Sequence, residues 1–155
     1  MNKDEYQDED FVPFNESLEI KELGFFDAVF AYYRKAKHNT DWLLFPSGDP
    51  DIQIRYQKGM QNYYSGLELI SAPTYSQAFR WFRKKYGLKH DIDDDNIGSK
   101  FYYKIKSFTD KFDNYNDILL LIRKEKDWSK IEFKTYEEAE LACLKKLIEI
   151  CKTKK

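Results

Sequence analysis

The sequence is poor in the residues from which most catalytic and ligand sites are built. Its 155 residues include only six glycines, two histidines and two cysteines. The glycines are scattered singly, so the chain has no glycine-rich loop of the kind that cradles phosphate. His38 and His90 each lack a second His or Cys at metal-ligand spacing, which argues against a zinc site. We therefore predict no catalytic residue, no bound metal and no cofactor.

One acidic run has the alternation of a calcium-binding loop. Asp91, Asp93 and Asp95 are spaced by two residues. The EF-hand pattern, however, requires glycine at its sixth position and glutamate at its twelfth. Those positions hold Asn96 and Tyr102 here, so we interpret the run as a solvated turn.

The two cysteines, Cys143 and Cys151, both fall in the last predicted helix. Eight residues of helix, at ~1.5 Å per residue, would separate their Cα atoms by ~12 Å, which is too far for a disulfide. We interpret them as free, structural thiols in a reducing compartment, the cytoplasm of the producing or infected cell. No signal peptide is recognised, and no apolar run is long enough to span a membrane.

Charge is nearly balanced overall, with a net charge of -1, but it is unevenly distributed. Residues 1–73 hold 7 Lys+Arg and 13 Asp+Glu, whereas residues 74–155 hold 19 and 14. Much of the acidic excess of residues 1–73 falls in residues 1–10, which we predict to be a disordered acidic tail. We expect residues 11–155 to form a single domain, with an N-terminal portion (11–70) and a helix–sheet–helix portion (71–155).

The N-terminal portion has the signals of a short helix followed by strands. Asn15 or Ser17 can cap a helix that ends at Gly24. Apolar or alternating runs then predict strands at residues 25–33 (centred on 28–33), 41–45, 52–56 and 63–70.

The clearest element is a helix over residues 74–86. Thr74 and Gln77 have the spacing of a capping box, Pro73 precedes them, and Gly87 is a suitable end. One face is apolar, and Arg80, Arg83 and Lys84 fall opposite, with Trp81 and Lys85 on one flank. Two interpretations stay open: an ordinary solvated basic face, or a binding surface with an exposed tryptophan.

Strands are predicted at residues 88–92, 101–106, 118–122 and 128–133, before a helix from Thr135 to about Lys152 that opens with a second capping box. The order α-β-β-β-α in residues 74–152 predicts an α+β fold, an antiparallel sheet covered by two helices, with a smaller N-terminal α+β portion. The residues expected in its core are Tyr75, Ala78, Phe82, Tyr103, Leu120, Cys143 and Leu147.

Two stretches resemble proteins of a known group. Ala72-Pro73-Thr74-Tyr75-x-x-Ala78-x-x-Trp81-Phe82-Arg83 and Thr135-Tyr136-Glu137-Glu138-Ala139 are similar to small uncharacterised proteins of bacteriophages and prophages of gut anaerobes. The resemblance implies a phage or mobile-element origin and an accessory role.

The order of elements in residues 74–152 also resembles the double-stranded-RNA-binding domain. In that domain the last helix opens with lysines that contact phosphate. Here the corresponding run is Lys134-Thr135-Tyr136-Glu137-Glu138, whose glutamates would repel phosphate.

We therefore expect a non-enzymatic accessory protein that binds a protein partner. One alternative is a nucleic-acid-binding module, and another is a structural virion component. The candidate binding face comprises Arg80, Trp81, Arg83, Lys84, Lys85 and Lys89.

Overall fold

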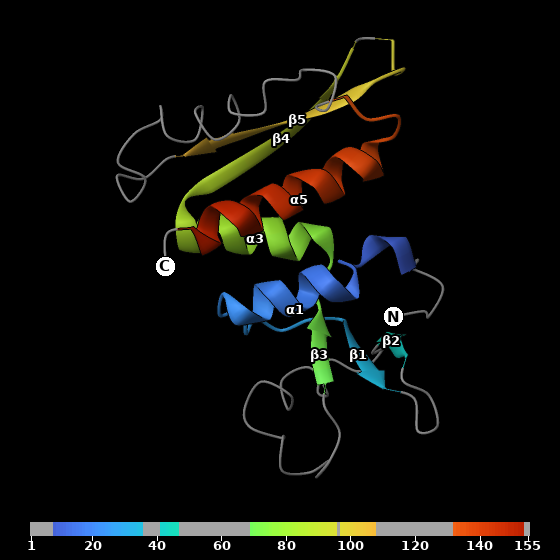
Figure 1. The fold of residues 1–155 in the computed structure, drawn as a ribbon, viewed down its shortest axis with the longest axis vertical. Helices are drawn as coiled ribbons and strands as arrows, with labels where there is room; N and C mark the ends of the chain where they lie inside the picture. Colours follow the sequence, from blue (N-terminus) through green and yellow to red (C-terminus); the bar gives the residue numbers. More distant parts are fainter. Residues whose placement is uncertain (1–7, 36–40, 47–68, 96, 108–131, 154–155) are drawn as a thin grey trace. The chain divides into compact units, whose positions relative to one another are not determined.

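The computed structural model describes residues 8–35, 41–46, 69–95, 97–107 and 132–153 (Figure 1). Helices and antiparallel strands make up these residues, which confirms the predicted α+β class. The chain divides into two compact units, residues 1–78 and 79–155. The division falls inside helix α3 (Tyr75–Tyr86), whereas the portions predicted from the sequence meet at residue 70.

Unit 1 contains a three-stranded antiparallel sheet with β1 (Ala31–Lys35) in the middle. Its neighbours are β2 (Trp42–Pro46) and β3 (Leu69–Ala72), and helix α1 (Phe14–Glu22) packs beside β3. The buried members of this core are Phe11, Ala31, Tyr33, Ile70 and Ala72.

Tyr33 connects the sheet to the segment that precedes α1. Its hydroxyl donates a hydrogen bond of 2.8 Å to the Val12 carbonyl. Burial, with smaller contributions from the negative charges of Asp8 and Glu16, raises the pKa of Tyr33 to about 12. The phenol is therefore a neutral hydrogen-bond donor at any physiological pH.

The start of α1 differs from the sequence prediction. The helix begins at Phe14, directly after Pro13, and no side chain caps it. Asn15 lies inside the first turn, and the Ser17 hydroxyl instead donates to the Val12 carbonyl at 2.9 Å. The predicted Asn15 or Ser17 cap is therefore wrong. Pro13 explains the earlier start, because its ring fixes φ and it lacks an N–H that would need a cap.

The end of α1 is as predicted. Its geometry also explains why the first strand begins later than predicted. Gly24 has a φ of +92°. Its N–H donates to Lys21 at 2.9 Å and the Phe25 N–H to Ile20 at 3.1 Å, which is the Schellman arrangement. Phe25 is thus held at the helix end, and β1 begins at Ala31, so it overlaps only the last residues of the strand predicted at 25–33.

The segment before α1 is anchored to the segment before α3. Residues Asp8–Asp10, which the sequence placed in the acidic tail, form a short 3₁₀ helix, η1. Phe11 and Val12 follow and are buried, and the Val12 N–H donates to the Pro73 carbonyl at 2.9 Å. Phe11 also forms an antiparallel bridge with Thr74.

Unit 2 contains an antiparallel hairpin of β4 (Leu88–Asp94) and β5 (Phe101–Ser107). Helix α5 (Tyr136–Lys152) packs along both strands, as Figure 1 shows. Phe133 adds one bridge to β5, through two N–H···O bonds of 2.8 Å with Phe101. The strands predicted at 52–56 and 118–122, and most of those at 63–70 and 128–133, lie outside the described residues.

The predicted core is confirmed for four residues, two on α3 and two on α5. Ala78, Phe82 and Cys143 are 0% exposed and Leu147 is 1% exposed. Tyr75 and Tyr103 were expected in the core as well, but each is only partly buried. A tyrosine can lie at the edge of a core with its hydroxyl in water, which is the ordinary position for this residue. Leu120 lies outside the described residues.

Replacing Phe82 with Ala should lower the free energy of unfolding by ~3–5 kcal/mol, because the ring is fully buried and its removal leaves a cavity. Urea denaturation followed by circular dichroism measures the change. Phe26→Ala is the matched control, since Phe26 is 70% exposed and its loss should change stability by less than ~0.5 kcal/mol. Equal effects of the two substitutions would contradict the orientation of α3.

Candidate functional site

The start of α3 is fixed by the capping box that the sequence predicted. The Gln77 N–H donates to the Thr74 hydroxyl oxygen at 3.2 Å, and the Thr74 N–H donates to the Gln77 side-chain oxygen at 3.0 Å. The Gln77 side-chain amide also donates to the Ala28 carbonyl at 2.9 Å. At the other end, Gly87 has a φ of +67°, and its N–H donates to the Arg83 carbonyl at 3.1 Å. The helix therefore has a defined beginning and end.

Three basic side chains form one exposed stripe along α3, which we call the basic stripe: Arg80, Arg83 and Lys84. All three are exposed, as the helical spacing predicted. Residues three and four apart lie side by side on a helix, so the three charges are neighbours. Within the described part of the chain none of them forms an ion pair. The helix itself contains no acidic residue.

Trp81 is not part of this exposed surface, which corrects the sequence interpretation. Its side chain is only 6% exposed. The indole packs edge-on against Phe82 and Tyr86, with ring centroids 5.0 and 5.4 Å away. The Lys85 ammonium lies 4.7 Å from the indole centroid, so Lys85 covers the ring instead of extending the basic stripe. A position 100° from Arg80 could be exposed or buried by periodicity alone, and tertiary packing decides it.

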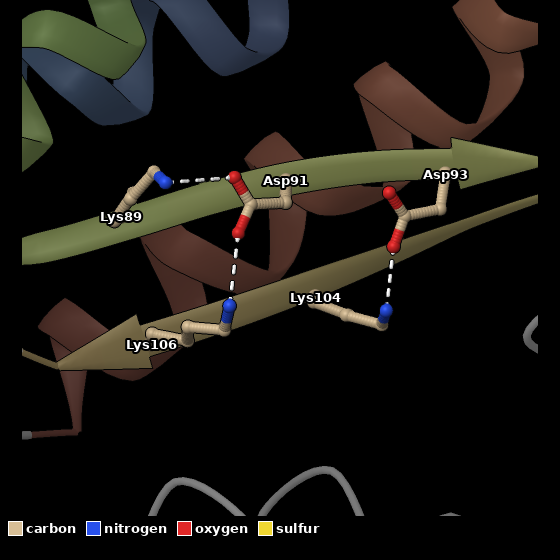
Figure 2. Close-up of polar contacts among 5 residues, drawn as sticks. All are labelled: Lys89, Asp91, Asp93, Lys104 and Lys106. Carbon is tan, nitrogen blue, oxygen red and sulfur yellow. Dashed lines mark hydrogen bonds and ion pairs between the residues drawn. The ribbon is translucent and has the colours of Figure 1, made fainter.

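Lys89, the last candidate, lies on the hairpin and is already paired. Its ammonium is 3.1 Å from the Asp91 carboxylate, and the other oxygen of that carboxylate is 3.2 Å from Lys106 (Figure 2). One step along the strands, Lys104 pairs with Asp93 at 2.5 Å. The hairpin face that carries these side chains thus contains charges of both signs that pair with one another, and Lys89 has a local partner.

These ion pairs also account for the acidic run that resembled a calcium loop. Hydrogen bonds from Lys89, and next from Lys106, hold the pKa of Asp91 below its usual value. The pKa of Asp95 is lowered by hydrogen bonds from Ser99, from the Oγ and then from the backbone N–H, the latter 3.0 Å long. Asp91, Asp93 and Asp95 are therefore occupied by lysines or by the hairpin turn. Among the described residues, no group of His, Cys, Asp or Glu is arranged to hold a metal ion.

The start of α5 carries negative charge. The Thr135 hydroxyl accepts from the Glu138 N–H at 3.1 Å, which confirms the predicted N-cap. The Glu138 carboxylate accepts from the Lys134 N–H at 3.0 Å, one residue earlier than in the standard capping box. Glu137 and Glu138 are both exposed. The double-stranded-RNA-binding domain has lysines at the start of its last helix instead.

His90 is a feature that the sequence did not reveal. Its imidazole stacks on the Phe79 ring with centroids 3.6 Å apart and an angle of 13°. Partial burial lowers the pKa of His90, and the nearby charges of Arg83 and Lys89 lower it further, while Asp91 acts in the opposite direction. The alternation of Leu88, His90 and Ile92 along β4 was the signal that could have placed this ring on the inner face of the hairpin.

Both cysteines are buried, and neither forms a disulfide. Cys143 is 0% exposed and Cys151 is 2% exposed. Burial, the largest influence, raises the pKa of the Cys143 thiol well above its usual range. The thiolate is the nucleophilic form of cysteine, so Cys143 is unreactive in the folded chain.

Comparison with known proteins adds no assignment. No family model, no curated protein and no solved structure matches the chain. In the part of the chain that the structure describes, no helix combines the length and the apolarity needed to cross a bilayer.

The His90 environment predicts how stability depends on pH. Because the folded state lowers the pKa of His90 from 6.5, the fold favours the neutral imidazole. The stabilising contribution is therefore complete above pH 6.5 and is lost as the pH falls below that value. Proton NMR titration of a His38→Asn variant, in which His90 gives the only histidine signal, should yield a pKa below 6.5. The titration would refute this environment if it gave 6.5 or above.

Proposed function

We propose that the chain is a non-enzymatic accessory protein that binds a protein partner through the basic stripe of α3. The observation that carries the proposal is a difference between the charged side chains of the hairpin and those of α3. On the hairpin, Asp91 and Asp93 are paired with neighbouring lysines, whereas Arg80, Arg83 and Lys84 have no ion-pair partner among the described residues. An acidic surface on a partner would supply the missing charges.

The proposal favours a protein over a nucleic acid because the exposed charges of unit 2 are of both signs. A polyanion is bound by a continuous array of Lys and Arg that neutralises successive phosphates. In unit 2, exposed Glu137 and Glu138 lie at the start of α5, and the hairpin face carries charges of both signs. A protein surface can match such a mixed pattern, whereas a uniform phosphate backbone cannot.

The phage or mobile-element origin implied by the sequence resemblance belongs to the same proposal. So does a cytoplasmic location, which is supported by two buried cysteines that do not form a disulfide.

Charge reversal on α3 tests the binding surface. Arg80→Glu/Arg83→Glu/Lys84→Glu should slow association with the partner by about tenfold or more, because charges at the edge of an interface act mainly on the association rate. Immobilised wild type and variant are exposed to extract from the native host, and a protein retained only by the wild type is purified for rate measurements. The fold is checked by circular dichroism, since all three side chains are exposed.

The matched control changes the same net charge on the hairpin. Lys100→Glu/Lys104→Glu/Lys106→Glu should retain the partner, because these lysines are paired locally. If both variants lose the partner equally, net charge rather than the basic stripe is responsible. Tight retention of the wild type on duplex RNA or DNA that disappears as salt rises would favour the nucleic-acid alternative.

A further inference from the structure

His90 connects the hairpin to the helix that carries the basic stripe. Its imidazole stacks on the Phe79 ring of α3, with ring centroids 3.6 Å apart and an angle of 13° between the ring planes. Gly87, which has a φ of +67°, ends α3 and allows the chain to turn directly into β4. His90 is the third residue of β4, so this contact follows from a short connection between helix and strand.

The stack also places the imidazole close to Arg83, a member of the basic stripe. Phe79 and Arg83 are four residues apart on α3, and residues at this spacing are neighbours on a helix surface. The imidazole that contacts Phe79 therefore lies within about one helical turn of Arg83. Burial lowers the pKa of His90 most, and the charge of Arg83 lowers it further, which agrees with this geometry.

Arg83 differs from the other charged groups around His90. The charged and titratable side chains on the surrounding elements are Arg83 of α3, Lys89 and Asp91 of β4, Lys104 and Lys106 of β5, and Glu140 and Cys143 of α5. The three lysines of this set are ion-paired with aspartates of β4. Burial raises the pKa of the Cys143 thiol, which stays neutral, and the charge of Glu140 acts on that thiol. Arg83 has no ion-pair partner among the described residues, so it is the positive charge near His90 that an external ligand can offset.

The stack is compatible with a protonated imidazole. The face of a phenyl ring attracts cations, so an imidazolium can remain on Phe79. The neighbouring carboxylate of Asp91 also favours the protonated form. A change in the charge of His90 therefore requires no rearrangement of α3 or of the hairpin.

An acidic group bound at Arg83 offsets the positive charge that opposes protonation of His90. Because coupling between two binding equilibria is reciprocal, protonation of His90 strengthens binding of the acidic group by the same factor. We propose that an acidic partner on the basic stripe and a proton on His90 favour each other, so that the partner binds more tightly at acidic than at neutral pH. This inference rests on the proposed function, because it adds regulation by pH to the same stripe.

The first part of the test removes the charge of Arg83. In a His38→Asn background, proton NMR titration should show that Arg83→Gln raises the pKa of His90 by about 0.3 or more, the equivalent of about a twofold change in affinity. Lys84→Gln is the matched control. It removes the same charge from the same stripe, but Lys84 is not a helical neighbour of Phe79, so the rise should be less than half as large. Equal effects of the two substitutions, or no effect of Arg83→Gln, would overturn the inference.

The second part uses hexa-aspartate with blocked termini as the acidic probe, and the corresponding asparagine peptide as its control. At low salt, saturating hexa-aspartate should raise the pKa of His90 by about 0.3 or more in the wild-type stripe and less in Arg83→Gln. Amide signals of α3 report binding separately. Changes in these signals without a change in the pKa of His90 would refute the coupling alone. No change in them up to about 10 mM peptide, a range chosen because exposed charge pairs bind weakly, would count against the proposed function as well.

The third part measures the affinity for hexa-aspartate between about pH 7.5 and about pH 5, the range in which histidine ordinarily titrates. Binding should tighten as the pH falls, by up to the factor that the rise in the pKa of His90 gives. His90→Asn should lose this gain, and it also corrects for protonation of the peptide carboxylates, which ordinarily titrate near pH 3.9. Circular dichroism checks the fold of this variant, and the NMR titrations do not depend on it. A pH dependence that His90→Asn retains in full would contradict the inference.

Discussion

The rotation of α3 about its own axis depends on the burial of Ala78 and Phe82, which lie one turn apart and are both 0% exposed. Successive residues of a helix are 100° apart, so once these two face the core the positions of all the others follow. Arg80 and Arg83 are then directed into solvent. The candidate site is therefore a consequence of the hydrophobic face opposite it, and the hydrogen bonds between Thr74 and Gln77 determine only where the helix begins.

Folding energetics give little reason for the basic stripe. Arg80 with Arg83, and Arg80 with Lys84, are like-charge neighbours, and each such pair costs about 0.2–0.5 kcal/mol on a helix surface. Arg83 and Lys84 lie in the last turn, where the helix dipole stabilises positive charge by about 0.3–1 kcal/mol per residue. The two effects are of similar size and opposite sign. The stripe is thus close to neutral for stability, so folding energetics alone do not account for the charge that is concentrated there.

Local signals predicted more of this fold than of the candidate site. Both helix-capping Thr residues, the Gly24 and Gly87 helix ends and the β4–β5 hairpin follow from spacing rules that act within a few residues. The errors concern longer-range packing. Trp81 is covered by Tyr86 and Lys85, and the chain after Phe25 enters the sheet later than its apolar run indicated. The ion-pair partner of each hairpin lysine could not be predicted from the sequence either, because it depends on the strand register.

The register of β4 and β5 explains why the hairpin charges are paired and those of the basic stripe are not. Asp91 lies opposite Lys104 across the hairpin, and the side chains on this face then pair diagonally, Asp91 with Lys106 and Asp93 with Lys104. A strand can thus obtain its counter-charges from its neighbour, whereas α3 has no acidic residue of its own to supply them. Arg80, Arg83 and Lys84 on α3 are therefore left without an ion-pair partner among the described residues, whereas the hairpin face carries charge of both signs. The difference between the two groups of charges in unit 2 thus follows from which of them lie on paired strands.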